Sequence, residues 1–312
     1  MTKETKFFRV ILRSLKIYFY YFVVKDEILA LYGGNKMDQG ISKFLMIMNE
    51  CCNKDVSAFD NEFLKKTLER RWKEIGCSTM DDYCSFIEQS ITEAEMFYKC
   101  LYINFSQFFR DNLSFSILEH IVLPQIISQK SPGSKIRIWS AGCSYGQEPY
   151  SIAMLLKDYE YKMGVEVPFH IFATDFSEEA LSLAKSGVYE ESNVQKVSLM
   201  RLKRYFNTKN NKYIVNSEIK KNITFLNYDM LDSTTTYPAE SIYGDFDVVL
   251  CCNMIIYYKP DVQKYIVKKL FSSLSDNGYL VTGEAEKILF ANTSQMNMLD
   301  IQSSVFKYRR GR

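Results

Sequence analysis

Short apolar segments alternate with amphipathic segments between residues 135 and 284, and this alternation limits the possible folds more than any other feature. The apolar runs have the length of strands, and the amphipathic runs have the length and period of helices. We predict strands at 135–141, 167–175, 222–227, 246–253 and 278–284, and helices at 149–159, 177–187 and 261–274. Strands that alternate with helices at this spacing predict a doubly wound, mostly parallel α/β sheet.

The remaining chain divides into regions of different pattern. We predict an N-terminal extension at 1–41, a helical domain at 42–125 and an α/β domain at 126–312. The helical domain is indicated by long proline-free stretches with helical periodicity. Inside the α/β domain, the segment at about 195–222 contains NTKNNK between two strand-like runs, which predicts a small antiparallel insertion.

The charge balance and the cysteine pattern exclude several classes of protein. The 312 residues carry 39 basic and 37 acidic side chains, so the chain lacks the basic excess of most nucleic-acid-binding proteins. The eight cysteines form no CxxC pair, and with only two histidines we expect no metal site. A chain of this length does not need disulfides, so we expect reduced thiols and a cytoplasmic protein.

The segment at 7–24, FFRVILRSLKIYFYYFVV, is apolar and aromatic but is interrupted by charges. A membrane span needs about 20 apolar residues, and Arg9, Arg13 and Lys16 break this run. These cations share one face of a helix, which would allow contact with a membrane surface or a partner. The alternative, which we favour, is an extension packed on the protein itself.

A glycine turn and an aspartate mark the ends of the first two predicted strands. Gly142 and Gly146 would let the backbone approach a ligand, and neither GxGxxG nor GxxxxGK[ST] is present. Asp175 ends the second strand, where a carboxylate can accept both ribose hydroxyls of a nucleoside. Asp175 would otherwise cap the next helix, but Ser177 is equally able to do so.

Two further segments place polar groups near the same edge. Asn253 ends the strand at 246–253 and is followed by Met254 and Ile255. The prolines of base-methylating enzymes are missing there, which argues against a nucleobase acceptor. Arg110 follows two aromatic residues in NFSQFFRD, residues 104–111. It would either hold a carboxylate in bidentate fashion or lie on the surface at a domain junction.

Taken together, these motifs resemble the CheR-type family of chemotaxis protein methyltransferases. The chain has NFSQFFRD, WSAGCSYGQEPYS, ATD, CCNMIIYY and GEAE in the order and spacing of that family, from about residue 42 to 310. The resemblance implies a helical domain, a Rossmann-like domain with a β insertion, and S-adenosylmethionine as methyl donor, with S-adenosylhomocysteine as product. It also implies bacterial signal transduction, with glutamates of a chemoreceptor-like protein as acceptors.

The resemblance also implies roles for individual residues. Cofactor contacts would come from Asn104, Ser106, Arg110, Gly142, Glu148, Asp175, Asp229, Met230, Asn253 and Met254. Tyr257 would lie near the acceptor site, and Arg70, Arg71 and Lys73 would face the acidic helical bundle of the receptor. We hypothesise that Arg110 and Tyr257 orient the acceptor or the reacting centre. We expect a monomer. A glutamate acceptor is already ionised near neutral pH, so transfer needs alignment and desolvation rather than a strong base.

Several positions depart from the family pattern. Tyr145 stands for threonine, Gln147 for glutamate, Cys252 for arginine and Asp229 for asparagine, and GEAE for the GHSE-like element. These departures leave two alternatives: a cofactor-binding regulatory module without turnover, and a methyltransferase for another protein or a small molecule.

Overall fold

The computed structural model describes residues 36–291 and 293–309, which form two compact units. One unit runs through Leu101 and the other begins at Tyr102. We expected this boundary near residue 125. It falls earlier because Phe108, Leu118 and Val122 are fully buried in the core of the second unit. The basic and aromatic segment at 7–24 lies outside the described residues.

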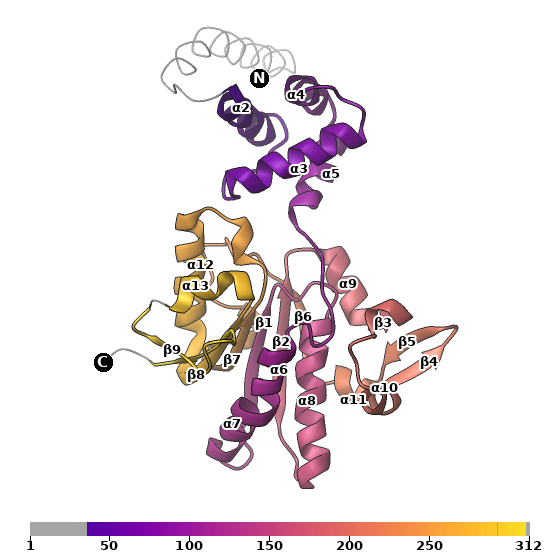
Figure 1. The fold of residues 1–312 in the computed structure, drawn as a ribbon, viewed down its shortest axis with the longest axis vertical. Helices are drawn as coiled ribbons and strands as arrows, with labels where there is room; N and C mark the ends of the chain where they lie inside the picture. Colours follow the sequence, from indigo (N-terminus) through magenta and orange to yellow (C-terminus); the bar gives the residue numbers. More distant parts are fainter. Residues whose placement is uncertain (1–35, 292, 310–312) are drawn as a thin grey trace, which may run out of the picture. The chain divides into compact units, whose positions relative to one another are not determined.

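The first unit is helical, as predicted. It contains α2 (Lys36–Glu50), α3 (Asn61–Glu74), α4 (Met80–Gln89) and α5 (Ile91–Leu101) (Figure 1). The Thr79 hydroxyl caps α4 by accepting the Asp82 N–H, and the Asp82 carboxylate accepts the Thr79 N–H, which completes a capping box. The rings of Phe44, Tyr83 and Phe97 pack together without exposed surface, and they form the centre of this unit's core.

The second unit contains a seven-stranded sheet with helices on both sides, as the alternation predicts (Figure 1). Its strands are β1 (Ile136–Ala141), β2 (Phe169–Asp175), β6 (Ile223–Asn227), β7 (Phe246–Cys251), β8 (Leu274–Thr282), β9 (Met296–Met298) and β10 (Val305–Tyr308). Its longer helices are α8 (Gln147–Met163), α9 (Glu178–Ser186) and α12 (Pro260–Ser273), and shorter turns are α6 (Asn112–Ile117), η1 (Leu118–Val122), α7 (Leu123–Gln129) and α13 (Lys287–Ala291).

The strand order alone indicates where a ligand would bind. The sheet runs β6-β2-β1-β7-β8-β10-β9, with parallel pairing from β6 to β8 and antiparallel pairing of β10 with both neighbours. The strands β2 and β6 lie on one side of β1 in the sheet, and the chain then crosses to the other side of β1 to form β7. Such a switch point opens a crevice beyond the carboxyl ends of β1 and β7, where open α/β sheets bind their ligands.

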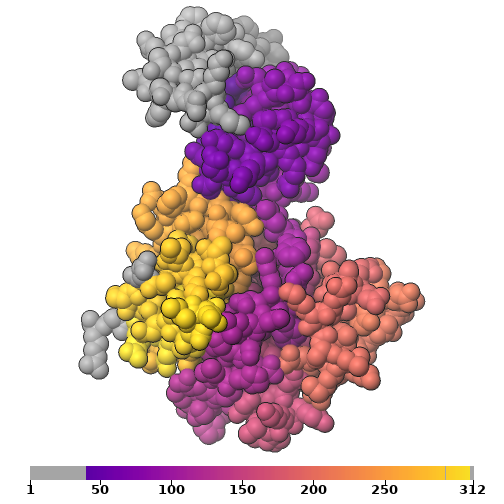
Figure 2. Space-filling model, in the orientation of Figure 1, coloured from indigo at the N-terminus to yellow at the C-terminus, as the bar shows by residue number. Residues whose placement is uncertain are grey.

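The predicted insertion is a small three-stranded sheet that stands out at the edge of the second unit (Figure 2). It contains β3 (Val188–Tyr189), β4 (Phe206–Lys209) and β5 (Lys212–Val215), with α10 (Leu199–Tyr205) and α11 (Ser217–Lys220) beside it. Asn210 and Asn211 both have positive φ, as a two-residue hairpin turn requires. No helix among the described residues is long and apolar enough to cross a membrane.

Candidate functional site

The glycine turn after β1 begins the site. Gly142 has φ +76° and Gly146 has φ +87°, in the left-handed region that favours glycine. A Cβ on Gly146 would lie 2.9 Å from the Cβ of Ala184, so a side chain has no room there. The N–H of Gly142 donates to the carbonyl of Thr174, which fixes the turn to the end of β2 (2.8 Å). The turn and the ends of both strands therefore form one rigid edge.

Asp175 ends β2 and closes this edge. Its carboxylate accepts the N–H of Ser144 at 2.8 Å and the N–H of Ser177 at 2.9 Å. The Ser177 hydroxyl caps α9, so Asp175 is not the helix cap. Burial raises the pKa of Asp175, and the backbone N–H donors oppose that rise. A carboxylate has about four acceptor positions, so Asp175 can still accept ribose hydroxyls.

Glu148 lies in the first turn of α8, where the helix dipole favours a negative charge. Its carboxylate accepts the hydroxyl of Ser140 at 2.7 Å. Burial raises the pKa of Glu148, while hydrogen bonds from Ser140 and Cys252 and the charge of Arg110 lower it. Cys252, which stands for the family's arginine, is therefore a neighbour of a carboxylate that we predict to bind the cofactor.

Arg110 belongs to the segment before α6 and is exposed. Phe108 and Phe109 on the preceding positions are buried and anchor it. The Arg110 guanidinium donates to the carbonyl of Phe105 at 3.3 Å. Burial raises the pKa of Tyr257, and the charge of Arg110 opposes that rise. The charge of Arg110 therefore acts on both Glu148 and Tyr257, two residues that the resemblance assigns to the same site.

The remaining predicted contacts lie on two loop segments, one before α6 and one after β6. Asn104 and Ser106 are half-buried on the segment that carries Arg110. Asp229 and Met230 follow β6, and the Asp229 carboxylate accepts the N–H of Leu231 at 2.8 Å. Lys269 donates to the carbonyl of Met230 at 3.0 Å and thereby holds this loop against α12.

Asn253 and Met254 follow β7 on the opposite side of the switch point from Asp175. Asn253 has φ +59°, and the loop is held by Glu286, a buried residue that sequence reasoning missed. A Cβ on Gly142 would lie 3.2 Å from the sulfur of Met254, so this side chain lies against the glycine turn. The signal for Glu286 was its place as the last residue of GEAE.

Two buried polar atoms at the glycine turn test whether the site fits a ligand. Among the described residues, the Ser144 hydroxyl oxygen and the Gln147 carbonyl oxygen are buried side-chain atoms without a hydrogen-bond partner. Buried polar groups are nearly always paired, so unpaired ones indicate a partner outside the chain. The turn therefore fits a polar ligand such as S-adenosylmethionine, and the Asp175 carboxylate binds the same turn through the N–H of Ser144.

The three basic residues predicted to face a partner lie on α3, in the first unit. Arg70 and Lys73 are exposed. The Arg71 guanidinium instead binds the carboxylate of Glu93 with two bonds, at 2.7 and 2.8 Å, and only 17% of its side chain is exposed. The hydroxyl of Tyr83 donates to the same carboxylate at 2.9 Å. Arg71 thus stabilises the unit from within.

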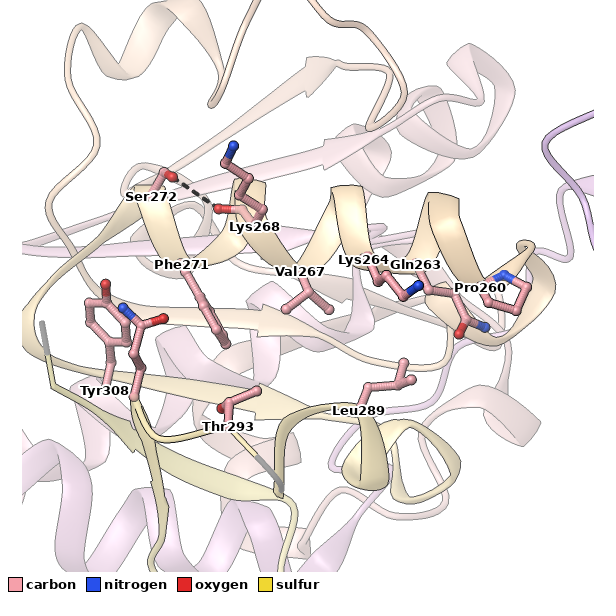
Figure 3. A pocket seen from close by; sticks show the side chains of 11 residues that line it. Pro260, Gln263, Lys264, Val267, Lys268, Phe271, Ser272, Leu289, Thr293 and Tyr308 are labelled. Carbon is pink, nitrogen blue, oxygen red and sulfur yellow. Dashed lines mark hydrogen bonds between the residues drawn. The ribbon is translucent and has the colours of Figure 1, made fainter. Parts of the chain in front are cut away.

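Two cavities lie away from these residues. One of about 830 Å³ runs along α12, where Val267 and Phe271 face Leu289 and Tyr308 (Figure 3). The other, of about 870 Å³, lies at the amino end of the sheet beside Arg137. Neither is lined by a predicted site residue.

Comparison with known proteins agrees with this arrangement. The family described as CheR methyltransferase, SAM binding domain, matches residues 104–305. Chemotaxis protein methyltransferase Cher2 of Pseudomonas putida is 36% identical over 59% of this chain and 66% of its own length, slightly under two thirds. A probable chemotaxis protein methyltransferase of Rhizobium etli is 31% identical over 75% of this chain and 88% of its own length. Chemotaxis protein methyltransferase 1 of Pseudomonas aeruginosa is 30% identical over 78% of this chain and 89% of its own length.

Proposed function

This chain belongs to the CheR methyltransferase family, and we propose that it methylates glutamate side chains of a chemoreceptor-like protein. Its relatives are named as chemotaxis protein methyltransferases, which supports the acceptor class. The observation that carries the proposal is the Asp175 carboxylate at the switch point, bound to a glycine turn whose buried Ser144 and Gln147 oxygens have no partner among the described residues. An exposed cation at a nucleoside site fits a carboxylate acceptor.

The reaction needs little proton chemistry from the protein. S-adenosylmethionine, when bound, supplies an activated methyl group. Asp175 would hold the ribose, and Glu148 and Asn253 the methionine part. Arg110 would bind the acceptor carboxylate, since a guanidinium offers five N–H donors in a fixed fork. Tyr257 would help to exclude water from it. Alignment of this kind lowers a barrier by roughly 7–11 kcal/mol in favourable cases.

The acceptor protein would be recognised through the first unit. Arg70 and Lys73 of α3 present exposed positive charge, which complements an acidic helical bundle. Arg71 is committed to Glu93, so we base docking on the other two. All eight cysteines are free thiols, which supports placing the reaction in a reducing cytoplasm.

The test is methyl transfer from labelled S-adenosylmethionine to a purified chemoreceptor cytoplasmic domain. We expect label on glutamates that mild base releases as methanol, because the product is an ester. The matched control is the same receptor domain with those glutamates replaced by alanine. Arg110→Ala should lower kcat/KM for the transfer; an unchanged value would remove Arg110 from the mechanism.

The alternatives give different results in the same assay. Binding of the cofactor without label on any acceptor would support a regulatory module, a reading that the Cys252 thiol beside Glu148 motivates. Base-resistant label would indicate a different acceptor chemistry. The double variant Arg70→Glu, Lys73→Glu should raise the KM for the receptor but not the KM for S-adenosylmethionine. The control is Lys264→Glu on α12, where the lysine side chain is 78% exposed, and it should leave the KM for the receptor unchanged.

A further inference from the structure

Glu286 ends the short helix Glu284–Glu286 that follows β8, and none of its surface is exposed. Its carboxylate accepts the N–H groups of three consecutive residues after β7. The distances are 2.7 Å to Asn253, 2.7 Å to Met254 and 2.6 Å to Ile255. It also accepts the N–H of Gly283 at 2.9 Å. One buried side chain thus joins the ends of two neighbouring strands.

The loop after β7 has the backbone of an anion-binding nest. Asn253 is left-handed at φ +59°, and Met254 is right-handed at φ −115° and ψ −42°. Successive residues of opposite hand turn their N–H groups toward one point, which makes a concave site for an anion. In this protein the anion is the carboxylate of Glu286. The loop conformation therefore depends on a side chain that lies about 30 residues away in the sequence.

The two strand ends approach so closely that the position of the loop has little freedom. A Cβ on Gly283 would lie 2.8 Å from the backbone nitrogen of Asn253. On the other side of the loop, the sulfur of Met254 lies against the position of Gly142. Met254 therefore bridges the glycine turn after β1 and the loop after β7, which are the two sides of the switch point.

We propose that Glu286 is a positioning residue of the cofactor site. Its carboxylate holds residues 253–255 so that Asn253 and Met254 meet the methionine part of S-adenosylmethionine. The inference rests on the placement of the methionine part in the proposed function, and it does not depend on the acceptor. Glu286 does not touch the ligand; it acts through the loop.

The experiment compares two ligands that differ only in the methionine part. S-adenosylhomocysteine carries the amino acid portion, and 5′-methylthioadenosine lacks it. We expect Glu286→Gln to weaken S-adenosylhomocysteine binding by about tenfold or more, since a charged acceptor of buried N–H groups is lost. Binding of 5′-methylthioadenosine should change by less than about twofold, because the ribose and adenine contacts remain. Glu286→Asp, which keeps the charge, should recover part of the affinity.

The matched control is Glu284→Gln, in the same turn. Glu284 is exposed and pairs with Ser304 and Lys287, so both affinities should stay at the wild-type value. Amide hydrogen exchange adds a readout without ligand: Glu286→Gln should speed exchange at 253–255 and leave β1 and β2 unchanged.

Two results would overturn the proposal. One is wild-type affinity for S-adenosylhomocysteine in Glu286→Gln; the other is equal loss of both ligands with faster exchange across the whole second unit. Receptor methylation is a separate measurement. A chain that binds S-adenosylhomocysteine through Glu286 but methylates no glutamate would keep this inference and lose the proposed acceptor.

Discussion

The two ends of the parallel sheet use their polar groups differently. At the amino end, the Arg137 guanidinium donates to the carbonyls of Ser241, Tyr243 and Gly244 and stacks on the Tyr243 ring at 4.2 Å. At the carboxyl end, the buried oxygens of Ser144 and Gln147 have no partner among the described residues. The Arg137 side chain stabilises the amino end, whereas these two oxygens of the glycine turn at the carboxyl end are available to a ligand.

The largest effect should come from Asp175→Ala. We expect loss of about 3 kcal/mol of binding, or roughly 100-fold in affinity for S-adenosylhomocysteine, because two hydrogen bonds to a charged group disappear. Thermal stability should fall less than affinity does: the N–H groups of Ser144 and Ser177 lose their acceptor, but a carboxylate whose pKa is raised by burial is also removed. Calorimetric titration and a thermal melt measure both quantities.

The control for Asp175 is an aspartate at the other end of the sheet. Asp247 pairs with Lys130 at 2.8 Å and accepts the N–H of Arg137 at 2.9 Å. Asp247→Ala should lower stability and leave ligand affinity unchanged. If the two variants showed the same pattern, the contrast between the two ends would be lost.

The next largest effect should come from Arg137, where we expect stability to fall and ligand affinity to stay the same. Arg137→Met should destabilise the fold by about 2 kcal/mol, since three carbonyls lose a charged donor while the apolar part of the side chain remains. Urea unfolding gives the stability, and titration should show an affinity within about twofold of wild type. A large loss of affinity would mean that the amino end also controls the ligand site.

A smaller effect is expected from pH. Burial raises the pKa of both Glu148 and Asp175, so these carboxyls take up protons at a higher pH than ordinary ones. The ionised forms bind the ligand, so affinity is full near neutral pH and falls as the pH drops toward their pKa values. We expect affinity to fall as the pH is lowered from about 7 to about 5. Glu148→Gln should flatten the profile; an identical profile in that variant would exclude Glu148.

The smallest effect should come from Ile242, in the loop that Arg137 holds. This β-branched residue has φ +65° and is 83% exposed. Ile242→Gly should stabilise the protein by about 1 kcal/mol through relief of backbone strain. A higher melting temperature with unchanged ligand affinity would agree with this expectation. A lower melting temperature would mean that the Ile242 side chain stabilises the fold by more than the backbone strain costs.

Much of the second unit follows from local sequence. The strands β1, β2 and β6 lie within a residue or two of their predicted ranges because apolar runs of that length have few alternatives. The strands β3, β9 and β10 are two to four residues long and too short to show a period. The boundary at Leu101 was missed because nothing local shows that residues 102–125 pack on the sheet.

The candidate site also contains residues that local sequence indicates and residues that it does not. Asp175 and the glycine turn could be proposed from the sequence because strand ends and glycines are local signals. Glu286 was missed because it serves a loop that only the pairing of β7 with β8 brings near. The inward direction of Arg71 had a signal, since it lies on the apolar stripe of α3 with Leu64 and Leu68, but its partner Glu93 is on another helix.

The most direct test of the ligand position is amide hydrogen exchange of the wild-type chain, with and without saturating S-adenosylhomocysteine. We expect slower exchange at residues 142–148 and 253–256, at the carboxyl end of the sheet, and no change at 241–247. Protection at 241–247, or none at the carboxyl end despite measured binding, would contradict it.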